Sequence, residues 1–189
     1  MKYKIAIDAD STLNNLAEGI VNLYNQTYED KISTDMFTDY NWYTCLPFEV
    51  ADRINKLLLE KELWDSLVPI KDAQSSVKIL MDSGIEVYIA TATNPVNFNW
   101  KVQWFAKYFP FIDEKHIICI HNKSLLDVDF LVDDCLEQLL SVKWAHRICL
   151  DQNWNRNVYD ECHSINRCYN WNEIVAKIKK IMKEEENYA

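Results

Sequence analysis

Short apolar runs, separated by helical patterns, constrain this 189-residue chain more than any other feature of its sequence. Five such runs occur, at residues 3–7, 85–90, 117–120, 129–132 and 147–150. Runs of this length, bounded by polar residues, predict buried strands. Because these strands alternate with helices, they indicate an α/β fold: a Rossmann-like parallel sheet flanked by helices on both faces.

The helical stretches carry recognisable start and stop signals. Pro95 suits the first turn of a helix over 95–108, and Gly84 suits the end of a helix over 72–83. Asn170, with Glu173 three residues later, predicts the start of the last helix. Two more helices are expected, one over residues 13–23 and a short one over residues 136–144.

Residues 27–69 lack this alternation and are rich in aromatic side chains, namely Phe37, Tyr40, Trp42, Tyr43, Phe48 and Trp64. One helix is expected at about 48–60, and no strand. We interpret the stretch as part of a small helical cap inserted after the first strand. The predicted domains are a core of residues 1–13 and 70–189 and a cap of residues 14–69.

Composition excludes some partners. The formal net charge of −9 would repel polymeric nucleic acid unless a basic face existed, and the one lysine cluster, at 177–183, precedes three glutamates. No signal peptide or membrane span is visible, so a cytoplasmic protein without a membrane partner is the default expectation. Of six cysteines, Cys119 and Cys149 are expected in the core, whereas Cys162-His163 with Cys168 is a weak zinc pattern.

Acidic residues end two of the predicted strands. Asp8 and Asp10 could divide the work of nucleophile and proton carrier, although turn capping is the alternative for such a pair. Asp133 and Asp134 would repel each other at a buried strand end unless a cation or a proton compensates. Since hard oxygen ligands suit Mg²⁺, a magnesium site is expected there.

Two further residues offer groups that could hold phosphate. Thr91 ends the 85–90 strand and carries a hydroxyl; helix capping is its alternative role, but Thr93 or Asn94 is better placed to cap the helix at Pro95. Lys123 lies in a loop between strands, where a solvated surface charge is the alternative.

The order of these groups resembles the four motifs of haloacid-dehalogenase-like phosphatases: an Asp-x-Asp-x-Thr strand end, a strand-end Thr, a Lys and an Asp-Asp strand end. The resemblance implies that Asp8 is the nucleophile and a Mg²⁺ ligand. It implies that Asp10 is the general acid and base and gives its backbone carbonyl to the metal. Thr91 and Lys123 would then bind phosphate, and Asp133-Asp134 would complete the metal site.

Residues 63–70, 130–134 and 147–156 further resemble the 5'(3')-deoxyribonucleotidase branch of that family. This resemblance implies hydrolysis of (deoxy)nucleoside 5'- or 3'-monophosphates through an aspartyl-phosphate intermediate. The implied substrate contacts are Trp42, Tyr43, Trp64, Ala92, Thr93 and Asn94. The chain departs from the branch at Ser11, where many relatives have Gly or Glu, and at residues 91–95, where the branch often has Thr-Ser-Pro.

Several alternatives stay open. The cap aromatics could simply form the core of the cap, and the substrate could be another small phosphoester such as a sugar phosphate. A degenerate binding protein would have lost turnover, but both Asp8 and Asp10 are present. A receiver-type signalling domain would place its acid pair first and has no place for residues 27–69. The sequence leaves the oligomeric state open, with a homodimer as one alternative.

Overall fold

Six parallel strands form the centre of the protein in the computed structural model, which describes residues 3–156 and 164–187. The strands are β1 (Lys4–Ile7), β2 (Glu86–Thr91), β3 (Ile117–Cys119), β4 (Phe130–Asp133), β5 (His146–Leu150) and β6 (Ile165–Cys168). Their order across the sheet is β3-β2-β1-β4-β5-β6. The predicted α/β fold is therefore confirmed, with β1, the strand that precedes Asp8, inside the sheet.

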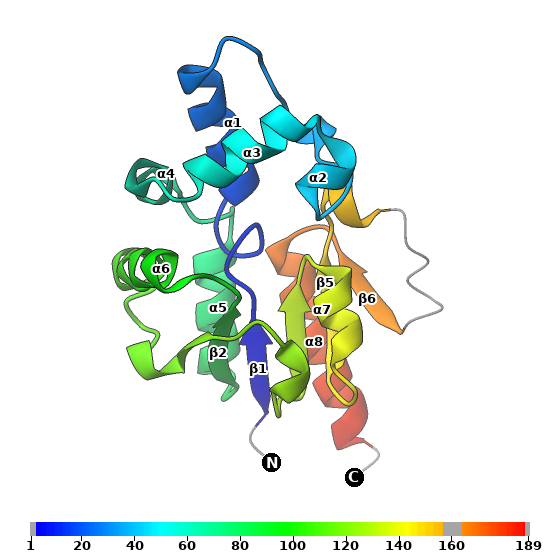
Figure 1. The fold of residues 1–189 in the computed structure, drawn as a ribbon. Helices are drawn as coiled ribbons and strands as arrows, with labels where there is room; N and C mark the ends of the chain where they lie inside the picture. The colour runs from blue at the N-terminus through cyan, green and yellow to red at the C-terminus, as the bar shows by residue number, and fades with distance from the viewer. Residues whose placement is uncertain (1–2, 157–163, 188–189) are drawn as a thin grey trace.

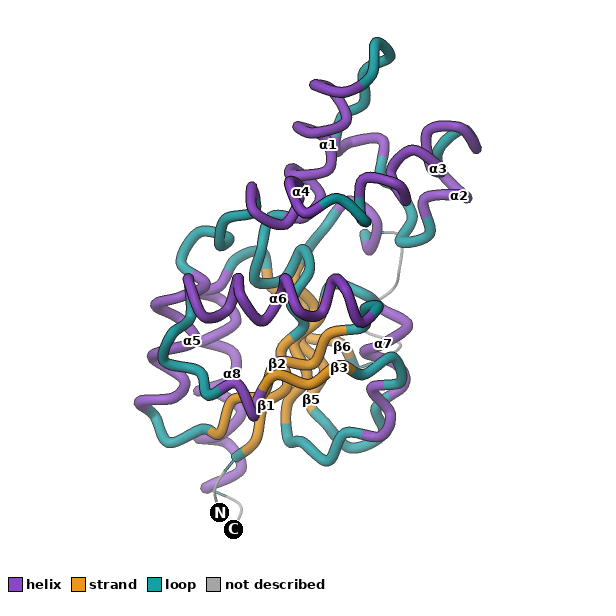
Figure 2. Tube along the Cα trace, turned by 60° about the vertical axis from the view of Figure 1, so that its left-hand side comes forward, coloured by secondary structure: helices purple, strands orange, loops and turns teal. Residues whose placement is uncertain are grey.

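The described residues form eight α-helices, some of which flank the sheet while others stand beyond its strand ends (Figures 1 and 2). They are α1 (Leu16–Thr27), α2 (Trp42–Cys45), α3 (Phe48–Leu57), α4 (Lys61–Ser66), α5 (Ala73–Asp82), α6 (Pro95–Tyr108), α7 (Leu136–Ser141) and α8 (Trp171–Glu186). Local signals set several boundaries. Asn94 and Asn170 each accept a backbone N–H from the first turn of the following helix, and Gly84 takes a φ of +87° just after α5.

The sheet buries apolar side chains on both faces because successive residues of a strand point to opposite sides. Ile5 and Ile7 belong to one core cluster together with Leu80 of α5 and Ile178 of α8. Ala6 belongs to the second cluster, which α7 completes. The buried strands therefore have continuous apolar sequences, which is the pattern that made them recognisable.

Helices α1 to α4 stand beyond the carboxyl ends of the strands (Figure 1). The chain leaves the sheet region at Asn15 and returns at Val68, and these two residues exchange hydrogen bonds: the Asn15 N–H donates to the Val68 carbonyl at 3.1 Å, and the Val68 N–H donates to Asn15 Oδ1 at 2.8 Å. The Ile70 N–H also donates to the Leu13 carbonyl at 2.8 Å. The two crossing segments are thus tied together beside the site described below.

Some expectations need correction. Strand β6 was not expected, because polar Asn166 and Arg167 interrupt its apolar pattern at the edge of the sheet. Cys119 is exposed rather than in the core, since it ends the opposite edge strand, whereas Cys149 is buried as expected. Helix α7 ends at Ser141, three residues earlier than expected.

In the part of the chain that the structure describes, no helix has the length and apolar character needed to cross a membrane. Cys162 and His163, which the weak zinc pattern included, lie outside the described residues.

Candidate active site

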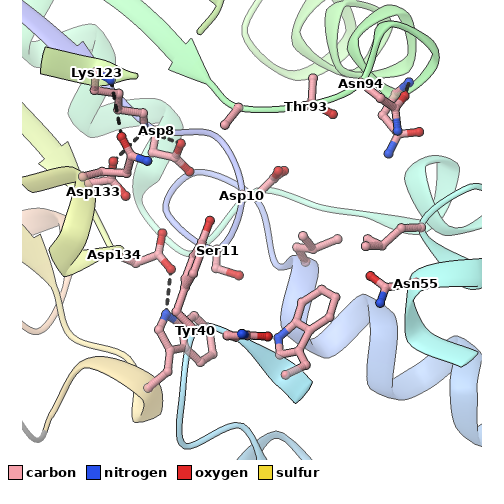
Figure 3. A pocket seen from close by; sticks show the side chains of 18 of the residues that line it. Asp8, Asp10, Ser11, Tyr40, Asn55, Thr93, Asn94, Lys123, Asp133 and Asp134 are labelled. Atoms are coloured by element: carbon pink, nitrogen blue, oxygen red, sulfur yellow. Dashed lines mark hydrogen bonds and ion pairs between the residues drawn. The ribbon is translucent and has the colours of Figure 1, made fainter. Parts of the chain in front are cut away.

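Three carboxylates from two strand ends meet at the carboxyl edge of the sheet (Figure 3). Asp8 follows β1, Asp133 ends β4 and Asp134 comes next, and one oxygen of each lies within 4.8 Å of the others. Strands β1 and β4 are neighbours, and the Asp8 N–H donates to the Val132 carbonyl at 2.9 Å. Parallel pairing therefore brings together residues that are more than 120 positions apart in sequence.

Lys123 lies underneath this cluster and is only 1% exposed. Its Nζ donates to Asp8 Oδ1 at 2.6 Å and to Asp133 Oδ2 at 2.5 Å (Figure 3). Burial alone would lower the pKa of Lys123, but the two carboxylates outweigh burial and hold that pKa above its usual value. The alternative of a solvated surface lysine is therefore wrong.

The electrostatics of the cluster favour an additional cation. Burial raises the pKa of Asp8 to about 7, against the opposing charge of Lys123 and with the help of Asp133. Burial and the neighbouring charges of Asp133 and Asp8 also raise the pKa of Asp134. One lysine thus does not compensate three crowded acids. Because hard oxygen ligands suit divalent cations such as Mg²⁺, this donor set fits such an ion.

The loop after β1 holds the cluster in shape. Ser11 takes a φ of +56°, a backbone conformation that glycine adopts more easily than serine. This conformation gives a physical reason why glycine would also suit the position. The Thr12 hydroxyl donates to Asp134 Oδ1 at 3.0 Å, and Trp154 Nε1 donates to Asp134 Oδ2 at 2.8 Å. Residues 147–156 therefore contribute a direct partner to the acidic cluster, which sequence reasoning did not foresee.

Asp10 and Thr91 meet through a residue that the sequence analysis missed. Lys101 of α6 forms an ion pair with Asp10, and its Nζ donates to Thr91 Oγ1 at 2.7 Å. Thr91 is fully buried, while the Lys101 side chain is 2% exposed. The helical spacing of the sequence could have revealed the burial of Lys101, because it places this lysine on the same face of α6 as Asn97, Trp104 and Phe105, which are all buried.

A cavity of about 480 Å³ lies between this site and helices α2 to α4. Its lining includes most of the expected site residues, namely Asp8, Asp10, Trp42, Tyr43, Trp64, Ala92, Thr93, Asn94, Lys123, Asp133 and Asp134. Thr91 is not among the described residues that line it, since Thr91 lies behind its wall. Residues at the strand ends and residues of helices α2 to α4 thus line the same cavity.

The aromatic residues of the cavity differ in how freely they face it. Tyr43 is 46% exposed and Trp42 is half-buried, whereas Trp64 is only 4% exposed and donates its Nε1 proton to the Leu58 carbonyl. Tyr40 and Asn55 also line the cavity, although they were not foreseen.

Comparison with protein families points in one direction. The family described as "5' nucleotidase, deoxy (Pyrimidine), cytosolic type C protein" matches residues 2–183. A 5'(3')-deoxyribonucleotidase of Bacillus subtilis is 32% identical over 183 residues, which cover 94% of this chain and 99% of that protein. A 5'(3')-deoxyribonucleotidase of Clostridium acetobutylicum is 30% identical over 156 residues, covering 82% and 86%.

Solved structures resemble the fold more distantly. A haloacid-dehalogenase-like hydrolase from Streptococcus pneumoniae has a TM-score of 0.66 at 12% identity, covering 93% of this chain and 98% of that one. A HAD family hydrolase from Deinococcus radiodurans, with bound phosphate and sodium, also has a TM-score of 0.66 at 11% identity, covering 94% and 95%. At these identities the likeness concerns the fold alone.

Proposed function

The chain belongs to the cytosolic type C 5'-deoxynucleotidase family and is a phosphatase with a haloacid-dehalogenase-like fold; on that premise we propose that it hydrolyses (deoxy)nucleoside 5'- or 3'-monophosphates with bound Mg²⁺. The observation that carries the proposal is the buried cluster of Asp8, Asp133, Asp134 and Lys123 at the floor of a cavity that has aromatic side chains on its opposite side.

The first step forms a bond between an Asp8 carboxylate oxygen and phosphorus. The bond from phosphorus to the ester oxygen breaks, and a protonated Asp10 gives its proton to the leaving alkoxide. Lys123 lies within 2.6 Å of the nucleophile and balances charge as the phosphoryl group arrives. Phosphoryl transfer depends mainly on such positioning and charge stabilisation.

The second step regenerates the enzyme. Water attacks the phosphorus of the aspartyl phosphate, its proton passes to the Asp10 carboxylate, and the bond between Asp8 and phosphorus breaks to release inorganic phosphate. Asp10 therefore acts first as an acid and then as a base. Side chains of Asp8, Asp133 and Asp134, with the Asp10 backbone carbonyl, would hold Mg²⁺, which neutralises negative charge so that carboxylate and phosphate can approach.

The nucleoside would occupy the part of the cavity that the cap encloses. Trp42 and Tyr43 are open enough to contact a base, and Ala92, Thr93 and Asn94 line the opposite side next to the phosphate site. Trp64, which is almost fully buried, supports this wall more than it offers a free face. In this proposal, residues 14–69 act as the cap that selects the substrate, and residues 1–13 and 70–189 carry the chemistry.

The test is phosphate release from a panel of 5'- and 3'-mononucleotides, a sugar phosphate and p-nitrophenyl phosphate, with Mg²⁺ and with a chelator. We expect deoxynucleotides to have the highest kcat/KM and activity to disappear with the chelator. A clear preference for the sugar phosphate would favour the alternative phosphatase. No release from any ester would favour a degenerate binding protein.

A further inference from the structure

Lys101 is a buried cation in the middle of α6 that joins three separate parts of the molecule. Its ammonium group pairs with Asp10 after β1, donates to the Thr91 hydroxyl at the end of β2, and lies 5.2 Å from the ring centroid of Trp64 in α4. The ring distance is within the range of a cation–π contact. Lys107, six residues further along the same helix, makes a similar contact with Tyr108 but is exposed.

A buried lysine of this kind contributes little to the stability of the fold. A buried ion pair loses the solvation of both partners, and apolar side chains of similar volume often stabilise a protein as well or better. A lysine that is 2% exposed therefore needs another reason to occupy this position. Its two polar partners are Asp10, which the proposed mechanism uses for proton transfer, and Thr91 at the end of β2.

The contacts define what Lys101 can do there. Asp10 receives Lys101 on Oδ2 and the Asn14 amide on Oδ1 at 3.1 Å, so donors on both oxygens fix the plane of the carboxylate. Because an ammonium group only donates, Thr91 must accept from it. The buried Thr91 hydroxyl therefore holds the ammonium group beside Asp10.

We propose that Lys101 is a positioning residue that aims the Asp10 carboxylate at the leaving group, is itself held in place by the Thr91 hydroxyl, and links Asp10 to the cap through Trp64. The inference rests on the proposed mechanism, in which Asp10 carries the proton. Helices α4 and α6 pack together, and Trp104 Nε1 of α6 donates to the Leu67 carbonyl at 3.0 Å, where the cap chain returns. Cap position and acid position are therefore coupled through one helix.

The experiment compares leaving groups in the variant Lys101→Met. An alkoxide leaving group requires a proton from Asp10, whereas 2,4-dinitrophenolate leaves without one. Product release is measured in a single turnover with excess enzyme, using a deoxynucleotide and 2,4-dinitrophenyl phosphate. We expect a loss of about 10²-fold with the nucleotide, at the lower end of general acid catalysis. The dinitrophenyl ester is expected to lose less than about threefold, because Asp8 and Lys123 are untouched.

Matched variants separate positioning from a general structural effect. Lys107→Met removes a lysine with a ring contact from the same helix and should leave both rates unchanged. Lys101→Arg keeps the donor and should recover part of the nucleotide rate without changing the dinitrophenyl rate. Trp64→Leu should show a smaller loss with the same leaving-group selectivity. If Lys101→Met does not fold, the nucleotide and the dinitrophenyl ester are compared in Lys101→Gln instead.

Equal losses on the two esters, or no loss on the nucleotide, would overturn the proposal. The result is separable from a failure of the nucleotidase assignment, because the comparison holds for any alkyl phosphate that the wild-type protein hydrolyses. If the wild type preferred a sugar phosphate, that ester would replace the nucleotide and the expected difference between leaving groups would be the same.

Discussion

The floor of the cavity and its cap side are built in different ways. On the floor, Asp8, Lys123, Asp133 and Asp134 are each at most 9% exposed, and several hydrogen bonds hold them in place at the carboxyl edge of the sheet. On the cap side, Tyr40 is 58% exposed and Tyr43 is 46% exposed, on short segments between α1 and α3. The contrast suggests a division of labour in which a rigid floor performs one chemistry and a more open cap selects what reaches it.

The largest expected effect concerns the floor. Asp8→Asn preserves shape but removes the nucleophile, so turnover of every phosphomonoester should fall by ~10⁴-fold or more. Phosphate release from a nucleotide and from p-nitrophenyl phosphate measures this. Asp127→Asn, at a fully exposed carboxylate, is the matched control and should change neither. If only the nucleotide rate fell, the division between floor and cap would be wrong.

A second prediction concerns pH and metal removal. The pKa of Asp8 is raised to about 7 in the metal-free fold and that of Asp134 is also raised, whereas an aspartate in the unfolded chain titrates near 4. The folded state therefore binds more protons in this window. Its stability advantage is complete below the unfolded pKa and is lost as pH rises through about 7.

Thermal melts without metal should accordingly show wild-type Tm falling between about pH 5 and pH 8 relative to Asp8→Asn, since each pKa unit corresponds to about 1.4 kcal/mol. Added Mg²⁺ should raise Tm more at the higher pH, because metal ligands must be deprotonated. A chelated protein whose Tm difference from Asp8→Asn does not vary with pH would contradict this account of the floor.

A third prediction concerns the cap. Trp42→Ala should raise KM for a nucleotide about 10-fold or more while changing p-nitrophenyl phosphate less than about twofold, since stacking on a base contributes about 1–3 kcal/mol. Steady-state kinetics on both substrates decides the point. Trp144→Ala, the matched control, removes a tryptophan that is 94% exposed and lies far along the chain from residues 14–69. It should change the KM of neither substrate. Equal effects on both substrates would show that Trp42 serves as cap core.

The smallest expected effect concerns Asn97, which lies in α6 and lines the same cavity. Asn97 is 5% exposed, and no described residue bonds its buried Oδ1. Because an unsatisfied buried polar atom costs about 1–3 kcal/mol, Asn97→Leu should raise Tm by a few degrees. Asn94→Leu, which removes the cap of α6, should lower Tm instead. A fall in Tm for Asn97→Leu would mean that the amide supports the fold.

The same contrast explains what the sequence could predict. Residues at the carboxyl ends of β1, β2 and β4 lie at one edge of a parallel sheet, so the positions of Asp8, Thr91 and Asp133-Asp134 could be predicted from the pattern alone. Lys123 required the resemblance, since nothing local distinguishes it from a surface lysine. Its burial became visible only once its loop was folded against Asp8.

Other features depend on packing that no local pattern encodes. Lys101 lies ten residues after Thr91, and only the path of α6 across the strand ends brings it to Asp10. The cap aromatics were recognisable as a group, but whether each is open or enclosed depends on how four short helices meet. Tyr43 is open to solvent, whereas Trp64 is enclosed. The edge strand β6 was missed for the related reason that half of it is polar.

The most direct test of the central claim is to trap the phosphoryl group on the protein. Asp10→Asn, which should slow hydrolysis of the acyl phosphate, is mixed with 2,4-dinitrophenyl phosphate and Mg²⁺, quenched in cold acid and examined by peptide mass spectrometry. The account predicts one added phosphoryl group on the peptide that contains Asp8, absent when the metal is chelated and absent in Asp8→Asn. Steady turnover with no label on Asp8, or the same label in Asp8→Asn, would contradict it.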